Sequence, residues 1–240
     1  MAIISDAAHS FGAKENGKYC LRSADFTCYS FHALKSITTG GEGGAVAWND
    51  IYGVNNDKLE RTFRLLGDHG QTSHDKTCSW EYDIAMFGYN SIMTNIDAAM
   101  GLVQLMRFNG IQDKRENVTA IYDTMFDCKS CGVTPLIEHL GMVNKSAMHL
   151  YPIRLPDHVG GEEGRNRIFK TLMNVGVPCN VHYKPLPMMT AYKNIGFDIK
   201  DFPNAYDMYK NLLTIPYHTS LTVSEQEYVV AKICEAVRYL

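Results

Sequence analysis

The sequence has no apolar run long enough to cross a bilayer, and its first residues lack the pattern of a signal peptide. It also lacks an excess of basic charge, because 26 acidic residues outnumber 23 Lys and Arg residues and give a net charge of −3. This balance argues against a general nucleic-acid binder. The 240 residues, 45% of them hydrophobic, are typical of a globular chain of one or two domains. We expect a cytoplasmic protein that binds neither membranes nor nucleic acid.

Paired metal-binding or redox motifs are missing as well. The seven cysteines are an odd number scattered through the chain, which predicts reduced thiols. Cys128-Lys-Ser-Cys131 is a lone CxxC with no second pair at ligand spacing, so we interpret it as structural and expect no metal site. The sequence has no GxGxxG motif, and residues 40–44 (GGEGG) lack the Lys-Ser/Thr that follows in a P-loop. We therefore do not interpret this stretch as a nucleotide-binding loop.

What the sequence does contain is one lysine beside an unusually glycine-rich loop. Residues 26–31 (FTCYSF) are typical of a β-strand, Lys35 follows, and four of residues 40–44 are glycine. Such a loop turns tightly and lets another group approach closely. A partly desolvated lysine loses its proton more readily and can form a Schiff base. A surface lysine beside a glycine-rich turn is the plain alternative, and on residue types alone it carries more weight.

A second stretch changes that balance. The chain opens with a short apolar strand that ends at Asp6 and continues into small residues. In open α/β sheets, ligands bind outside the carboxyl ends of the strands, where Asp6 is expected to lie. Enzymes that use pyridoxal phosphate need a lysine for the aldehyde and an acidic partner for the pyridinium nitrogen. Asp6 and Lys35, each at the end of its own strand, supply that pair of groups.

The two motifs together resemble a known family. Residues 6–13 (DAAHSFGA) and 30–46 (SFHALKSITTGGEGGAV), in this order and spacing, closely resemble the nucleotide-sugar aminotransferases of the DegT/StrS type. The resemblance implies an α/β protein with the fold-type-I architecture of pyridoxal-phosphate enzymes. Residues 1–112 would be the later part of the large mixed or parallel sheet domain, and residues 113–240 the smaller α+β C-terminal domain.

The resemblance also implies roles for single residues. Lys35 would hold pyridoxal 5′-phosphate as a Schiff base and move the proton during catalysis, while Asp6 would bind the pyridinium nitrogen. The other implied contacts are those of His9 with Asp6 or the ring, of Ser30 with the phosphate, and of His32 as support for the substrate site. His32 is placed on the strand face of Ser30 by alternation.

A later motif concerns the subunit interface. Thr94, with Asp97 three residues later, predicts the start of a helix. From local physics alone we expect this helix to be buried. By resemblance, Asn90 before this helix reaches the cofactor phosphate of a neighbouring subunit, which implies a homodimer with shared active sites. Ile92 departs from the family pattern and puts the local contact in doubt.

The C-terminal part carries a further motif of the family. His182 and Tyr183 precede Lys-Pro-Leu, and the resemblance places both rings at the mouth of the active site near the nucleotide sugar. An edge strand that ends in a proline turn, with solvated rings, is an equal alternative. His69 and His74, in the polar loop of residues 71–81 or just before it, are interpreted as ordinary loop histidines.

The implied activity is transfer of an amino group from an amino acid, L-glutamate in the family, to a keto group of a nucleoside-diphosphate sugar, for cell-surface polysaccharide or amino-sugar biosynthesis. Relatives with histidine in place of the lysine are sugar dehydratases, and Lys35 argues against that branch. The family's phosphate-binding turn and stacking aromatic have no counterpart before Asp6. The stronger alternative is therefore a truncated scaffold, either catalytically silent or a regulatory or dimerisation partner.

Overall fold

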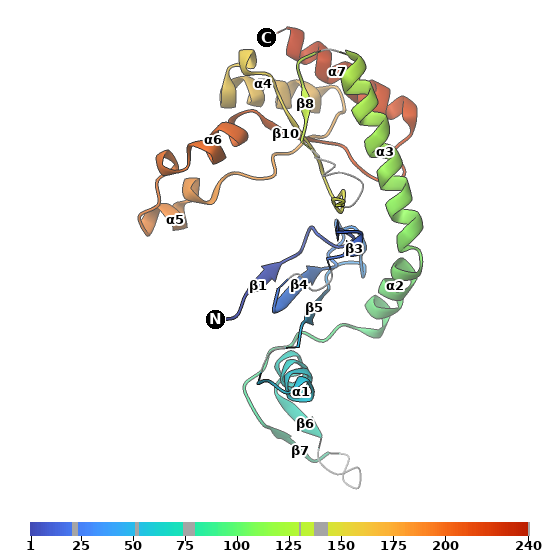
Figure 1. Ribbon diagram of the computed structural model, residues 1–240, viewed down its shortest axis with the longest axis vertical. Helices are drawn as coiled ribbons and strands as arrows, with labels where there is room; N and C mark the ends of the chain where they lie inside the picture. Colours follow the sequence, from blue (N-terminus) through green and yellow to red (C-terminus); the bar gives the residue numbers. More distant parts are fainter. Residues whose placement is uncertain (21–23, 51–52, 74–79, 130, 137–143, 240) are drawn as a thin grey trace. The chain divides into compact units, whose positions relative to one another are not determined.

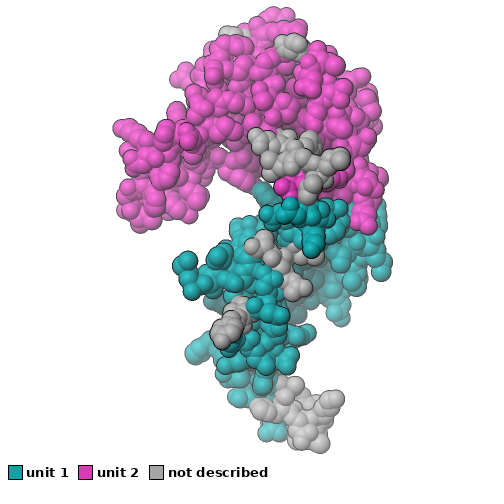
Figure 2. Space-filling model, in the orientation of Figure 1, with its two compact units in different colours: residues 1–108 teal, residues 109–240 magenta. Residues whose placement is uncertain are grey.

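The computed structural model describes residues 1–20, 24–50, 53–73, 80–129, 131–136 and 144–239. The fold is mixed α/β, as expected, and the chain forms two compact units, Met1–Phe108 and Asn109–Leu240 (Figure 2). The sequence placed the boundary between residues 112 and 113. Each unit is described by itself below.

The centre of the first unit is a three-stranded sheet of order β1-β4-β5. Strand β1 (Ile4–Asp6) runs parallel to β4 (Phe26–Ser30), and β5 (Gly44–Trp48) runs antiparallel to β4. Strands β1 and β4 were predicted from their apolar and aromatic runs, and they are confirmed. The first unit also contains two small antiparallel pairs of strands. One pairs β2 (Lys14–Glu15) with β3 (Lys18–Tyr19), and the other pairs β6 (Gln71–Ser73) with β7 (Tyr82–Ile84). His74 lies outside the described residues.

Helix α1 (Asn56–Gly67) covers one part of this sheet. The ring of Phe63 packs against Trp48 of β5, with 5.3 Å between the ring centroids, and against Phe26 of β4 at 5.9 Å. The Asn55 side chain caps the first turn by accepting a hydrogen bond from Lys58 N. The packing of α1 thus fixes the two strands that flank the lysine-bearing loop.

Helix α2 (Asn95–Met106) begins where the sequence predicted, since Thr94 Oγ1 accepts the hydrogen bond of Asp97 N at 3.2 Å. The expectation of a buried helix is wrong, because none of its residues is buried in this chain. Its small-residue side packs on the glycine-rich loop: a Cβ added to Gly101 would lie 2.8 Å from Thr39 Cγ2. Leu102 of this helix is 60% exposed and Leu105 51%.

The second unit contains the main hydrophobic core. Strand β9 (Tyr151–Arg154) lies between β8 (Thr134–Pro135) and β10 (Leu212–Ile215) in an antiparallel sheet. The longer helices are α3 (Phe108–Lys129), α4 (Gly161–Asn174), α6 (Pro203–Lys210) and α7 (Val223–Arg238), joined by α5 (Thr190–Asn194) and the short turns η1 (Asp157–Val159), η2 (Leu186–Met188) and η3 (Ile199–Asp201) (Figure 1). The largest fully buried side chains come from helices and strands alike and include Tyr122, Tyr151, Ile153, Ile168, Leu213 and Ile233.

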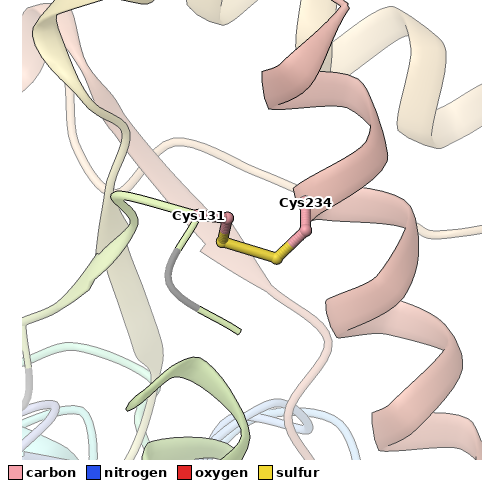
Figure 3. The surroundings of a disulfide bond; sticks show 2 residues. All are labelled: Cys131 and Cys234. Atoms are coloured by element: carbon pink, nitrogen blue, oxygen red, sulfur yellow. A yellow bond between two sulfur atoms is a disulfide. The ribbon is translucent and has the colours of Figure 1, made fainter. Parts of the chain in front are cut away.

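A disulfide joins two distant parts of this unit. Cys131, just after α3, is bonded to Cys234 of α7 across 103 residues, with 5.5 Å between the Cα atoms (Figure 3). The expectation of reduced cysteines is therefore wrong for this pair. The physical reason is tertiary: α7 packs back onto the core beside the turn that follows α3, and spacing along the chain does not reveal such a contact.

The other described cysteines are free. Cys128 is an exposed thiol, so the two cysteines of the CxxC motif are not bonded to each other. Burial raises the pKa of the Cys179 thiol to about 12, which keeps it protonated and unreactive at neutral pH. None of the described helices has the length and apolar character that a membrane span requires.

The start of α7 is fixed by a full capping box. Thr222 Oγ1 accepts from Glu225 N, and the Glu225 carboxylate accepts from Thr222 N at 2.8 Å. We expect Thr222→Ala to lower the free energy of unfolding by about 1 kcal/mol, because it leaves the helix amide without its partner. Urea denaturation of Thr222→Ala and Thr222→Ser measures this, since serine keeps the cap. Equal stability of the two variants would contradict the assignment.

Candidate active site

The lysine lies in a closed turn at the end of β4. The backbone N–H of Thr39 donates to Phe31 O at 3.1 Å, and Phe31 N donates to Gly43 O at 2.7 Å. Between these residues, Lys35 N donates to His32 O at 2.9 Å and shapes the tip of the turn. Residues 31–39 therefore form a loop that is closed at its base, with the half-buried Lys35 in its middle.

The glycines of the adjacent loop are needed for close approach, as predicted, but the groups that approach belong to the chain itself. A Cβ on Gly43 would lie 2.1 Å from Thr39 Oγ1, and one on Gly44 would lie 2.7 Å from Tyr29 O. Gly40 has a φ of +109°, a conformation that side chains with a Cβ rarely adopt. The glycine-rich loop thus folds tightly against the base of the lysine turn.

Asp6 lies at the carboxyl end of β1, in register with Cys28 of the neighbouring parallel strand. The next residue extends the ladder, since Ala7 N donates to Cys28 O at 2.8 Å. The Asp6 side chain is exposed, and its Oδ1 accepts from Ala8 N at 3.0 Å. The carboxylate and the lysine turn therefore follow the same ends of two adjacent parallel strands, as the sequence predicted.

Ser30 and His32 are linked to the turn through the backbone. Ser30 Oγ accepts from His32 N at 3.3 Å, and His32 Nδ1 accepts from Leu34 N at 3.2 Å. The neutral imidazole consequently carries its proton on Nε2, which faces Glu42 Oε1 at 3.8 Å. The placement of His32 by strand alternation is wrong, because β4 ends at Ser30 where the chain begins its turn.

The remaining predicted residues of the first unit are His9 and Asn90. His9 is half-buried in the segment that follows β1. Asn90 is exposed and pairs with Asp68 in an isolated antiparallel bridge. Three residues later, Met93 Cε would lie 3.3 Å from a Cβ on Gly43, so this segment runs beside the glycine-rich loop. The roles of His9 and Asn90 toward a cofactor stay predictions.

His182 and Tyr183 belong to the second unit. Their rings meet edge to face, with 4.7 Å between the centroids, and Tyr183 is 60% exposed. Just before them, Asn180 exchanges two backbone hydrogen bonds with Thr214 of β10, which agrees with the edge-strand interpretation of this backbone. A contact of these rings with a substrate bound at Lys35 stays a prediction.

Sequence reasoning missed Thr39, which is only 3% exposed and closes the base of the lysine turn. The available signal was a threonine directly before a glycine run, but nothing local shows that its side chain points inward. Among the residues that the structure describes, no three His, Cys, Asp or Glu side chains gather as metal ligands would.

Comparison with known proteins gives consistent results. A curated relative is the UDP-4-amino-4,6-dideoxy-N-acetyl-beta-L-altrosamine transaminase of Campylobacter jejuni, with 34% identity over 228 residues. The match covers 95% of this chain and 56% of that relative. Among solved structures, a putative sugar aminotransferase from Streptococcus pneumoniae in its PMP form superposes with a TM-score of 0.91 and 37% identity. The superposition covers 100% of this chain and 59% of the Streptococcus chain.

A second solved structure is PseC of Helicobacter pylori, an aminotransferase of pseudoaminic acid biosynthesis. Its TM-score is 0.84 at 27% identity, over 100% of this chain and 60% of that one. The chain thus spans between half and two thirds of the length of these relatives. The sequence pattern of the DegT/DnrJ/EryC1/StrS aminotransferase family matches residues 1–234. The chain belongs to the DegT/DnrJ/EryC1/StrS aminotransferase family.

Proposed function

We propose that this chain carries the lysine-bearing part of a sugar aminotransferase site. The reaction moves an amino group from an amino acid, L-glutamate, to a keto group of a nucleoside-diphosphate sugar. The observation that carries the proposal is the turn of Lys35 next to Asp6, at the carboxyl ends of two adjacent parallel strands. The names of the Campylobacter and Streptococcus proteins support the substrate class and the cofactor.

The donor set of the site fits pyridoxal 5′-phosphate. When bound, this group supplies an electron sink for the carbon that exchanges its amino group. The Lys35 amine would bind its aldehyde and would take up and return a proton. The exposed Asp6 carboxylate, oriented by Ala8 N, is suited to hold a protonated ring nitrogen, and the Ser30 hydroxyl to donate to a phosphate oxygen.

We further propose that the chain works as a homodimer. The support is the apolar side of α2, which no other described part of the chain covers: Ile96 is 74% exposed, Leu102 60% and Met106 85%. Contiguous apolar patches of this kind mark interaction sites. Burial of this helix against a second copy would bring the Asn90 segment to the interface, as its predicted role requires.

The test is the half-reaction with the amino donor. The chain is incubated with pyridoxal 5′-phosphate and L-glutamate, and 2-oxoglutarate is measured by mass spectrometry; the proposal expects one equivalent per chain. Asp6→Asn removes the negative charge that would hold the ring nitrogen, and we expect it to slow this release by about 100-fold. Asp57→Asn, the same change in the exposed first turn of α1, is the matched control. An Asp6→Asn variant as fast as the control would contradict the role of Asp6.

The second candidate is a scaffold of this fold without activity of its own. It predicts no 2-oxoglutarate and no covalent adduct of Lys35 under the same conditions, so one experiment separates the two candidates.

A further inference from the structure

We infer that Thr39 is a positioning residue that sets the geometry of the lysine turn through the carbonyls of Phe31 and Glu42. The inference rests on the proposed function of Lys35. It concerns a residue that has no charge and whose side chain lies at the base of the turn rather than at its tip.

The first argument is hydrogen bonding. Thr39 N donates to Phe31 O at 3.1 Å and closes the base of the turn. Its hydroxyl donates to Glu42 O at 2.8 Å, while the distance from this hydroxyl to Phe31 O is 3.4 Å. Thr39 is 3% exposed, so little water is available to replace the hydroxyl bond. One residue therefore links the end of β4 to the glycine-rich loop.

The second argument is shape. The Thr39 hydroxyl lies where a Cβ on Gly43 would be, at 2.1 Å, and its methyl group faces Gly101 of α2, at 2.8 Å from the corresponding Cβ position. The chain has a glycine at each of the two places where a side chain would displace Thr39. The hydroxyl and the methyl group thus have separate partners, and single substitutions can remove them one at a time.

These contacts reach Lys35 through a hydrogen bond between the lysine turn and the glycine-rich loop. Ala33 N donates to Gly41 O at 3.0 Å, and Ser36 and Ile37 are buried just after the lysine. Loss of the Thr39 hydroxyl releases the Glu42 carbonyl and lets the glycine-rich loop shift, and Ala33 moves with Gly41. The backbone of Lys35, two residues after Ala33, then shifts, and small displacements of a reacting group are costly for catalysis.

The experiment compares Thr39→Val, which keeps the shape, with Thr39→Ser, which keeps the hydroxyl. In the chain without cofactor, the rate at which acetic anhydride modifies Lys35 is measured by mass spectrometry, with Lys170 of α4 as the internal reference. A second readout is the yield of the borohydride-fixed adduct of pyridoxal 5′-phosphate on Lys35. We expect Thr39→Val to change the Lys35 rate by about threefold and to lower the adduct yield by about tenfold, with Thr39→Ser close to wild type.

Two results would overturn the inference. One is a Thr39→Val variant that loses thermal stability but keeps the wild-type Lys35 rate, since this shows a structural role alone. The other is a Thr39→Ser variant as impaired as Thr39→Val, since then packing on Gly101 is responsible. If the wild-type chain forms no adduct at all, the proposed function fails, whereas the acetylation rates still test Thr39.

Discussion

Replacement of Lys35 by alanine is expected to abolish the release of 2-oxoglutarate, with a loss on the order of 10⁴-fold. The reason is that the amine has two tasks, to bind the cofactor aldehyde and to move the proton, and a methyl side chain performs neither. The rate is measured by mass spectrometry of the keto acid, with L-glutamate as donor and pyridoxal 5′-phosphate in excess.

Two further variants make this result specific. Lys35→Arg keeps the positive charge, yet we expect it to be as inactive as alanine, because a guanidinium does not give up its proton in proteins. Lys58→Ala on the exposed side of α1 should retain the wild-type rate. A Lys35→Ala variant with a tenth of the wild-type rate or more would show that another group carries the chemistry.

Substitution of Gly164 by alanine is expected to have the largest effect on stability. Gly164 lies in the first turns of α4, and an added Cβ would lie 1.5 Å from the carbonyl oxygen of Val159. A backbone carbonyl cannot rotate aside as a flexible side chain can, so the start of α4 must shift away from the core. We expect a loss of about 4 kcal/mol in the free energy of unfolding, measured by urea denaturation.

Gly110→Ala is the matched control for this variant. Gly110 lies in α3 and has no atom within 4 Å of its Cβ position. Alanine is the better helix former, so we expect this substitution to stabilise the protein by up to about 1 kcal/mol. A loss as large as that of Gly164→Ala would mean that clash at Val159 is not the cause.

The sequence predicted those features that depend on local signals. Thr94 marked a helix start correctly because a capping hydroxyl and its amide lie three residues apart. The strand that ends at Asp6 and the strand that precedes Lys35 were also predicted, since short apolar and aromatic runs that end at polar or small residues are typical of strands. The parallel pairing of β1 and β4 then brought both residues to the same edge of the sheet.

The features that the sequence did not predict depend on contacts between distant residues. The Cys131–Cys234 disulfide joins positions that are far apart in the chain, and no spacing rule connects them. In the sequence, Thr39 resembles an ordinary loop residue. Its side chain points inward because Gly43 and Gly101 leave room for it, and the sequence does not reveal those contacts. The exposure of Leu102 and Leu105 was missed for a related reason: apolar spacing predicts that a helix face is covered, but not whether its own chain covers it.

The most direct test of the central claim is to map the lysine that binds the cofactor. The chain is mixed with pyridoxal 5′-phosphate, its visible absorption is recorded, and borohydride fixes any adduct before digestion and mass spectrometry. The account predicts a visible band that borohydride removes and a single modified peptide that contains Lys35. An adduct spread over exposed lysines, or one absent from the Lys35 peptide, would contradict it.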